Sequence, residues 1–342
     1  MIADLIGLIR ADHWWDYKIV PILSTFYATA LVLDVALGSL WVSALLLLIA
    51  IVPAAIYASL LNDITDLAGD LKAGKRNGVA GRPLWMVATL VAITLAVGLL
   101  FAWLWRDDVP LLSFYLATWL AFSLYSLPPF RLKERGAAGV LCDAAGEHLF
   151  PALVAVFLAF RAGERAPSAA WVAAVAVWAL AYGLRGIVWH QLTDVDNDRI
   201  AGYRTLARRH PSAARVIGTF VVFPIEVAGL AAVLWQIGSP WPPAFLALYV
   251  LYAVRSARRW RSAPVIVEPK SRSFIVLQQF YSDLFPIALL ITASVLDPRA
   301  LIILAVHLIL FPSRVLYAIR RLSASIASTV DNASEPHHGG VA

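Results

Sequence analysis

Long apolar segments constrain the fold of this chain more than any other feature. Runs of about 20 apolar residues recur along it, the length at which an α-helix crosses a hydrocarbon layer about 30 Å thick. The 342 residues are 61% hydrophobic and only 15% charged. A water-facing shell could not cover so much apolar surface, so a soluble globular fold is excluded. We expect an all-α, polytopic transmembrane helical bundle.

Ten segments are candidates for membrane-spanning helices, and about nine to ten of them are expected to span, around a central cavity. We expect one membrane-embedded domain over residues 1–321. Residues 322–342 are polar, small and turn-rich, which predicts a disordered cytoplasmic tail. The ten segments cover residues 19–37, 40–61, 84–105, 109–127, 140–160, 169–192, 213–236, 241–255, 274–296 and 299–317.

Basic residues gather in alternate connecting loops, which indicates the orientation of the chain. The loops expected on one side are rich in Lys and Arg, and the positive-inside rule then places both termini in the cytoplasm. This distribution accounts for the net charge of +6 without a nucleic-acid partner. Lys18, beside Trp14 and Trp15, is interpreted as an interfacial anchor rather than a phosphate contact. The opposite side carries only Arg106, Arg161, Arg165 and Arg299.

Two carboxylate clusters interrupt the apolar pattern where helices meet cytoplasmic loops. In the first, Asp63, Asp66 and Asp70 are spaced i, i+3 and i+7, and Asn62 lies one turn before Asp66. On a helix this spacing places all four side chains on one face.

The second cluster repeats part of the first. Asp194 and Asp198 are spaced i and i+4, and the pattern Asp-x-x-x-Asp-x-x-Ala-Gly-x-Arg occurs at residues 66–76 and again at 194–204. Parallel membrane repeats leave such traces. Solvated aspartates paired with nearby Lys and Arg would explain one cluster, but two with matched spacing favour a functional site.

The functional interpretation is divalent metal binding. Carboxylates with Asn are hard oxygen ligands that suit Mg²⁺, which retains waters and accepts phosphate oxygens. A single cysteine and few histidines argue against zinc. Arg76, Arg82 and Arg204 would supply charge for phosphate oxygens that the metal leaves free. A diphosphate held in this way becomes a good leaving group, and an apolar cavity would take a long hydrophobic tail.

At these residues the chain resembles the UbiA superfamily of intramembrane prenyltransferases. "NDITDLAGD" is similar to its N-D-x-x-D-x-x-x-D motif and "DVDND" to its second D-x-x-x-D motif. "KRNGVAGRPL" and "YSLPPFRLKERG" resemble its segments after the first motif and after helix 4. The resemblance spans roughly residues 10 to 300. Departures are a tenth apolar segment beyond the usual nine helices, and Asp196, an additional carboxylate in the second motif.

The resemblance implies that an isoprenyl diphosphate binds through Mg²⁺ and ionises, and that the carbocation alkylates an acceptor, often an aromatic ring. By position, one metal would be held by Asn62, Asp63, Asp66 and Asp70, and a second by Asp194 and Asp198. Candidate diphosphate contacts are Arg76, Arg82, Tyr125, Arg131 and Lys133.

Other polar residues inside apolar segments are weaker candidates. Asp143 and Glu147, at i and i+4, are candidates for acceptor binding or proton removal, the alternative being that Asp143 is solvated near the cytoplasmic loop. Arg185 is expected to face the cavity and bind substrate, or to pair with an acid. His190 and Gln191 could orient ligands or bind acceptor, or form structural hydrogen bonds.

Three alternatives remain open at this stage. A terpene cyclase of the same fold would need no acceptor, and a related enzyme would transfer a phosphoribosyl group to a polyprenyl phosphate. A cation- or proton-coupled transporter is the non-enzymatic alternative. It is disfavoured because transporters hold their acids near the bilayer midplane, whereas these clusters lie at helix ends.

Overall fold

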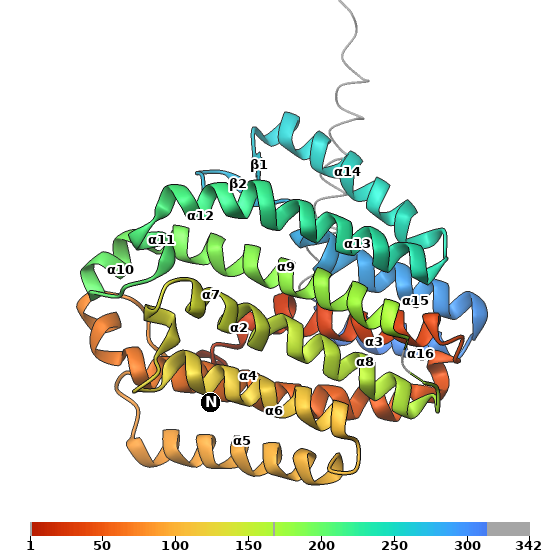
Figure 1. The fold of residues 1–342 in the computed structure, drawn as a ribbon, viewed down its shortest axis with the longest axis horizontal. Coiled ribbons are helices and arrows are strands. Elements are labelled where there is room, and N and C mark those ends of the chain that lie inside the picture. The colour runs from red at the N-terminus through yellow and green to blue at the C-terminus, as the bar shows by residue number, and fades with distance from the viewer. Residues whose placement is uncertain (1, 167, 313–342) are drawn as a thin grey trace, which may run out of the picture.

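The computed structural model describes residues 2–166 and 168–312, so the predicted tail over residues 322–342 lies outside the described residues. The chain forms a bundle of helices packed side by side (Figure 1). The predicted all-α class holds, apart from a parallel pair of three-residue strands, β1 (Ala263–Val265) and β2 (Ser273–Ile275). The α-helices are α1 (Ile2–Ile9), α2 (Ala11–Trp14), α3 (Val20–Val32), α4 (Trp41–Lys72), α5 (Leu84–Leu104), α6 (Val109–Ser126), α7 (Ala137–Ala144), α8 (Phe150–Ala162), α9 (Ala169–Thr193), α10 (Val195–Ala201), α11 (Leu206–Arg209), α12 (Pro211–Ile217), α13 (Phe223–Ile237), α14 (Trp241–Trp260), α15 (Phe285–Leu296) and α16 (Ala300–Leu310).

Six helical runs in the described ranges are long and apolar enough to cross a membrane, which confirms the polytopic character. Two predicted spans differ from that pattern. α3 has only 13 residues and is preceded by Asp16 and Lys18, and α14 ends in a row of arginines. Shorter apolar helices cover Phe280–Leu296 and Ala300–Leu310. The six long runs are Leu37–Lys72, Leu84–Leu104, Val109–Ser126, Ala137–Ala162, Ala169–Thr193 and Pro211–Ile237.

π-Helical turns join several of these helices into longer runs. A π turn carries one residue more than an α turn, and so changes the direction in which the neighbouring side chains point. Such turns often occur at functional sites. Two of them, η1 (Trp15–Ile19) and η4 (Ala145–Leu149), join α2 to α3 and α7 to α8, and the others are η5 (Gly218–Val222) and η6 (Phe280–Leu284).

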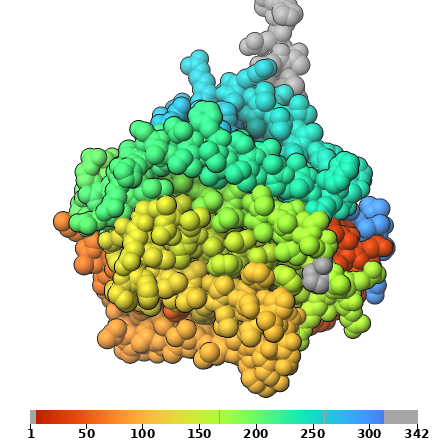
Figure 2. All heavy atoms as spheres, viewed as in Figure 1, coloured from red at the N-terminus to blue at the C-terminus, as the bar shows by residue number. Residues whose placement is uncertain are grey.

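Helix α9 lies within the bundle, packed against α13, α7 and α8. Its residues Trp171 and Trp178 are almost fully buried, and Trp178 packs edge-on against Tyr281 and Phe285. The N-terminal helix α3 packs between α8 and α15, which joins the two ends of the described chain. α5 lies at the edge of the bundle, against α4 and α6. Side chains fill the spaces between helices on the face drawn in Figure 2.

Candidate active site

A cavity of about 810 Å³ lies between η1, α4, α6, α7, η4, α9 and the segment after β2. Helix α4 makes room for it, because most of the residues on its cavity face are small. A rise of about 1.5 Å per residue puts Ile51 about 16 Å from Asn62 along the helix axis, so this face runs deep into the bundle. The α4 residues in the cavity wall are Ile51, Ala54, Ala55, Ala58, Ser59 and Asn62.

The first aspartate cluster continues this face of α4 beyond the cavity. Asp66, one turn after Asn62, accepts hydrogen bonds from Arg131 at 2.9 Å and Lys133 at 2.6 Å. Lys133 also donates to the Asn62 side chain at 2.9 Å. Burial lowers the pKa of the Lys133 ammonium, and the neighbouring Asp66 carboxylate only partly opposes that effect. The segment after α6 thus supplies two cations to the first cluster.

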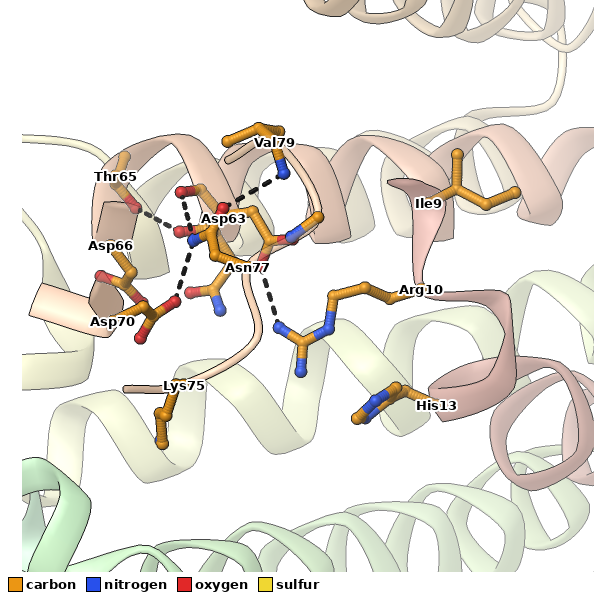
Figure 3. Close-up of polar contacts among 12 residues, drawn as sticks. Ile9, Arg10, His13, Asp63, Thr65, Asp66, Asp70, Lys75, Asn77 and Val79 are labelled. Atoms are coloured by element: carbon orange, nitrogen blue, oxygen red, sulfur yellow. Dashed lines mark hydrogen bonds and ion pairs between the residues drawn. The ribbon is translucent and has the colours of Figure 1, made fainter. Parts of the chain in front are cut away.

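Asp63 has a different environment from its two partners. Its side chain is fully buried and accepts one hydrogen bond from Arg10 at 2.9 Å and one from the Gly78 amide at 2.7 Å (Figure 3). Asn77 donates to the Asp63 carbonyl and to the Asp70 carboxylate, both at 2.9 Å. Asp63 therefore holds the N-terminal segment and the loop after α4 in place, and its role as a metal ligand stays a prediction.

The second cluster lies at a helix break. α9 ends at Thr193 and α10 begins at Val195, so Asp194 sits between them. Asp194 accepts a hydrogen bond from Lys75 at 2.7 Å, and Asp198 accepts one from Thr205 at 2.8 Å. Burial raises the pKa of Asp198, as do the carboxylates of Asp194 and Asp66. Burial also acts to raise the pKa of Asp194, but His190 and Lys75 outweigh it and lower the value.

The two copies of the sequence pattern end in the same backbone turn. Gly74 and Gly202 both take positive φ, at +66° and +89°, which glycine adopts at little cost and which ends each helix. The residue after each glycine donates its amide to the carbonyl of the second aspartate, Asp70 or Asp198, at 2.9 Å in both copies.

The side chains that follow these turns reach across the site in both directions. Lys75 bonds the carboxylate of Asp194, while the Tyr203 hydroxyl donates to the Asp66 carbonyl at 3.1 Å. Arg131 lies over the Tyr203 ring at 5.7 Å. We call Lys75 and Tyr203, with their two contacts, the crossed contacts. They bring the two aspartate clusters together at one end of the cavity.

Comparison with known proteins identifies the family to which this architecture belongs. The sequence model of the UbiA prenyltransferase family matches residues 22–277. The chain belongs to the UbiA prenyltransferase family. It is therefore a member of an enzyme family, as the two aspartate motifs predicted.

Solved structures support the same fold. A UbiA homolog from Archaeoglobus fulgidus bound to GPP and Mg²⁺ has a TM-score of 0.56 and 14% identity, over 88% of this chain and 99% of that one. The same homolog bound to DMAPP and Mg²⁺ has a TM-score of 0.54 and 17% identity, over 85% and 99% of the two chains. No curated protein sequence matches this chain significantly.

The donor set suits a magnesium ion that keeps waters and substrate oxygens among its ligands better than it suits a metal enclosed entirely by protein side chains. Within residues 2–166 and 168–312, no three His, Cys, Asp or Glu side chains converge closely enough to hold a metal by themselves. Mg²⁺ is commonly held by one or two carboxylates, with waters and substrate phosphates completing its shell. Asp66 with Asp70, and Asp194 with Asp198, are two such pairs, and in this structure cations of the chain neutralise Asp66 and Asp194.

The structure divides the predicted diphosphate contacts into two groups. Tyr125 lines the cavity, and Arg131 and Lys133 bind Asp66. By contrast, Arg76 is an exposed residue 3.7 Å from Asp12, and Arg204 is exposed after α10. Arg82 is half-buried at the end of the loop after α4.

Two predicted substrate-binding residues have structural partners away from the cavity. Arg185 does not line it: the side chain is buried and pairs with Glu226, with one contact of 2.7 Å, so the alternative of an acidic partner is confirmed. Tyr281 donates to the same Glu226 carboxylate at 2.9 Å. Gln191 accepts from the Ala207 amide at 3.2 Å and holds α11 against α9. Sequence reasoning missed Glu226, although a carboxylate within the predicted span 213–236 was a signal for a buried partner.

The remaining candidates lie in the cavity wall. Asp143, Glu147 and His190 all line it, as a role in binding an acceptor requires. Lys18 lines it too and pairs with Glu147, so its interpretation as an interfacial anchor was wrong. The pattern of Lys beside two tryptophans matched an interface, but Lys18 lies on the π turn η1 and its side chain lines the cavity.

Proposed function

We propose that this UbiA-family prenyltransferase transfers an isoprenyl group from an isoprenyl diphosphate to a small-molecule acceptor, with Mg²⁺ assisting departure of the diphosphate. The observation that carries the proposal is the joining of two aspartate pairs, through the crossed contacts, at one end of an 810 Å³ cavity. Structures of a UbiA homolog bound to GPP or DMAPP with Mg²⁺ support this choice of substrate and metal.

Two Mg²⁺ sites follow from the donors. Asn62, Asp66 and Asp70 would hold one ion, with Asp63 supporting them, and Asp194 and Asp198 would hold the other. Held by these residues, Mg²⁺ would supply the positive charge that stabilises the leaving diphosphate.

The side chains of this protein position the substrate and stabilise charge. Arg131 and Lys133 stand beside Asp66, where they can donate to diphosphate oxygens that the metal leaves free. Lys75, which pairs with Asp194 in this structure, supplies a third cation beside the second aspartate pair. The apolar face of α4 would hold the isoprenyl tail and exclude water, so that an allylic cation survives until the acceptor reacts.

The same proposal covers topology. We place residues 1–321 in one membrane domain of about nine to ten spanning helices, with both termini in the cytoplasm and the aspartate pairs at the cytoplasmic end. Membership of an enzyme family gives the transporter alternative no support. Cyclisation would be a different outcome of the experiment that follows, whereas phosphoribosyl transfer would need a phosphoribosyl diphosphate and a polyprenyl phosphate as substrates in its place.

The test is diphosphate release from labelled geranyl, farnesyl and longer isoprenyl diphosphates by purified protein with Mg²⁺, with and without candidate acceptors. We expect acceptor-dependent release, and none after chelation of Mg²⁺. A cyclised hydrocarbon formed without acceptor would identify a cyclase instead. Failure to release diphosphate from every isoprenyl substrate would refute the proposal.

A further inference from the structure

A group of charged side chains in the cavity wall takes no part in the diphosphate site, and it includes Lys18, Asp143 and Glu147. The Lys18 ammonium donates to the Glu147 carboxylate, joining residues 129 positions apart in the sequence. Both partners lie on π-helical turns, Lys18 on η1 and Glu147 on η4. Two local departures from α-helical geometry thus meet at one ion pair inside the cavity, and such turns often mark functional positions.

Asp143 lies near the Lys18 ammonium but is not its ion-pair partner, because Lys18 pairs with Glu147. Asp143 is 8% exposed and lines the cavity, and it forms no ion pair with any of the described residues. Its neighbour Tyr125 interacts with it through the hydroxyl. A carboxylate buried in a helical bundle costs free energy unless it is paired or serves a ligand, so an open carboxylate facing a cavity is a candidate for binding or catalysis.

The position of Asp143 matches the reacting end of the substrate. Lys133 contacts Asp66, at the end of the cavity where the diphosphate is proposed to bind. Helix α7 begins soon afterwards in the sequence, at Ala137. Asp143 is six residues further along, about 9 Å deeper at the α-helical rise. A diphosphate bound between the aspartate pairs would therefore place its allylic carbon at about the level of Asp143.

The charges around this position select the kind of acceptor. Arg10 and Lys18, the Lys and Arg side chains that line the described cavity, are each paired with a carboxylate, Asp63 and Glu147, so neither is left to hold an acceptor carboxylate beside Asp143. A like charge placed against it costs several kcal/mol, whereas a neutral hydroxyl can donate a hydrogen bond to the open carboxylate. His148, 8% exposed and 4.5 Å ring to ring from Tyr182, completes the wall with an aromatic surface.

We infer that Asp143 is the general base of an acceptor chamber that takes a neutral phenol and rejects aromatic carboxylates. This inference rests on the proposed function. The C–O bond of the isoprenyl diphosphate breaks, and its electron pair leaves with the diphosphate. A ring carbon of the phenol forms the new C–C bond while the phenolic proton passes to the Asp143 carboxylate. The proton on the alkylated carbon then shifts to the phenol oxygen, and Asp143 returns its proton to water.

The experiment compares acceptors and variants with geranyl diphosphate and Mg²⁺. Wild-type protein should alkylate neutral phenols from a size-graded panel at least about tenfold faster than their ring-carboxylated counterparts, because one like charge costs more than the 1.4 kcal/mol of a tenfold ratio. Asp143→Asn should lower phenol alkylation about 100-fold or more, the usual contribution of a general base. Geranyl diphosphate binding, measured separately, should be unchanged.

The matched control is Asp196→Asn, the same change at an exposed carboxylate that pairs only with Arg199 among the described residues. It should leave the alkylation rate unchanged. Binding of geranyl diphosphate reports folding of each variant, and the acceptor preference of the wild-type protein needs no variant at all.

Three results would overturn the inference while leaving the diphosphate chemistry intact. They are equal alkylation by the Asp143→Asn and Asp196→Asn variants, faster alkylation of carboxylated phenols, and cyclised product in place of any alkylated phenol. Failure of the wild-type protein to bind geranyl diphosphate or to release diphosphate would instead refute the proposed function, and the inference with it.

Discussion

In the first aspartate cluster, Asp66 and Asp70 lie on one unbroken helix, α4, which continues to Lys72. In the second, α9 ends at Thr193 and Asp194 occupies the break before the short helix α10. The spacing of the two carboxylates is the same in both, and so is the glycine turn that follows. The two clusters thus share the glycine turn and the side chain after it that contacts the other cluster. They differ in the helix that carries the carboxylates, which is continuous in the first cluster and broken in the second.

The largest effect should come from removing one carboxylate from either half. Asp66→Ala and Asp194→Ala should each reduce diphosphate release by at least about 10²–10³-fold, since each removes a ligand that stabilises the leaving charge. Membrane insertion and gel-filtration behaviour should stay normal. Near-normal release by both variants would show that these aspartates are not the metal ligands, and loss in only one would show that the two halves are not equivalent.

A second experiment separates two members of the first cluster. Asp63→Ala leaves Arg10 and the buried Gly78 amide without their acceptor, so the free energy of unfolding should fall by about 3–5 kcal/mol. Asp70→Ala loses one side-chain hydrogen bond among the described residues, from Asn77, and should cost about 1–3 kcal/mol while abolishing turnover. Thermal melting in detergent, paired with diphosphate release, measures both. Equal melting temperatures for the two variants would remove the structural role given to Asp63.

The smallest effect concerns the close approach of the two halves. A Cβ on Gly69 would lie 2.2 Å from the Tyr203 hydroxyl oxygen, so Gly69→Ala must displace Tyr203 and break its contact with Asp66. We expect a loss of about 1–3 kcal/mol in unfolding free energy. Gly186→Ala is the matched change, with no heavy atom within 4 Å of the new methyl group, and should stabilise by up to about 1 kcal/mol. Equal melting temperatures in this pair would mean that Tyr203 does not pack on α4 as described.

Features that depend on local sequence pattern could be predicted for this protein, whereas pairings between residues far apart in the sequence could not. The apolar runs, the spacing of Asp66 and Asp70, and the repeat at residues 194–204 all lie within a few helical turns, where periodicity is informative. The partner of Arg185 lies 41 residues away and that of Lys18 lies 129 residues away, and no single sequence specifies such pairings. The π turns η1 and η4 were also missed, because one inserted residue leaves no compositional trace. Lys18 and its partner Glu147 lie on these two turns, and both line the cavity.

The crossed contacts have a consequence for the spacing of the two aspartate pairs at the proposed substrate site. Each of them fastens the end of one half to the other half, so sliding α4 along α9 would break both at once. The separation between the aspartate pairs is therefore set when the chain folds, before any ligand arrives, and such preorganisation saves the ordering cost of binding. If the proposed function is correct, the spacing at the mouth of the cavity would be fixed for the charged headgroup, and differences among substrates would be accommodated in the deeper chamber.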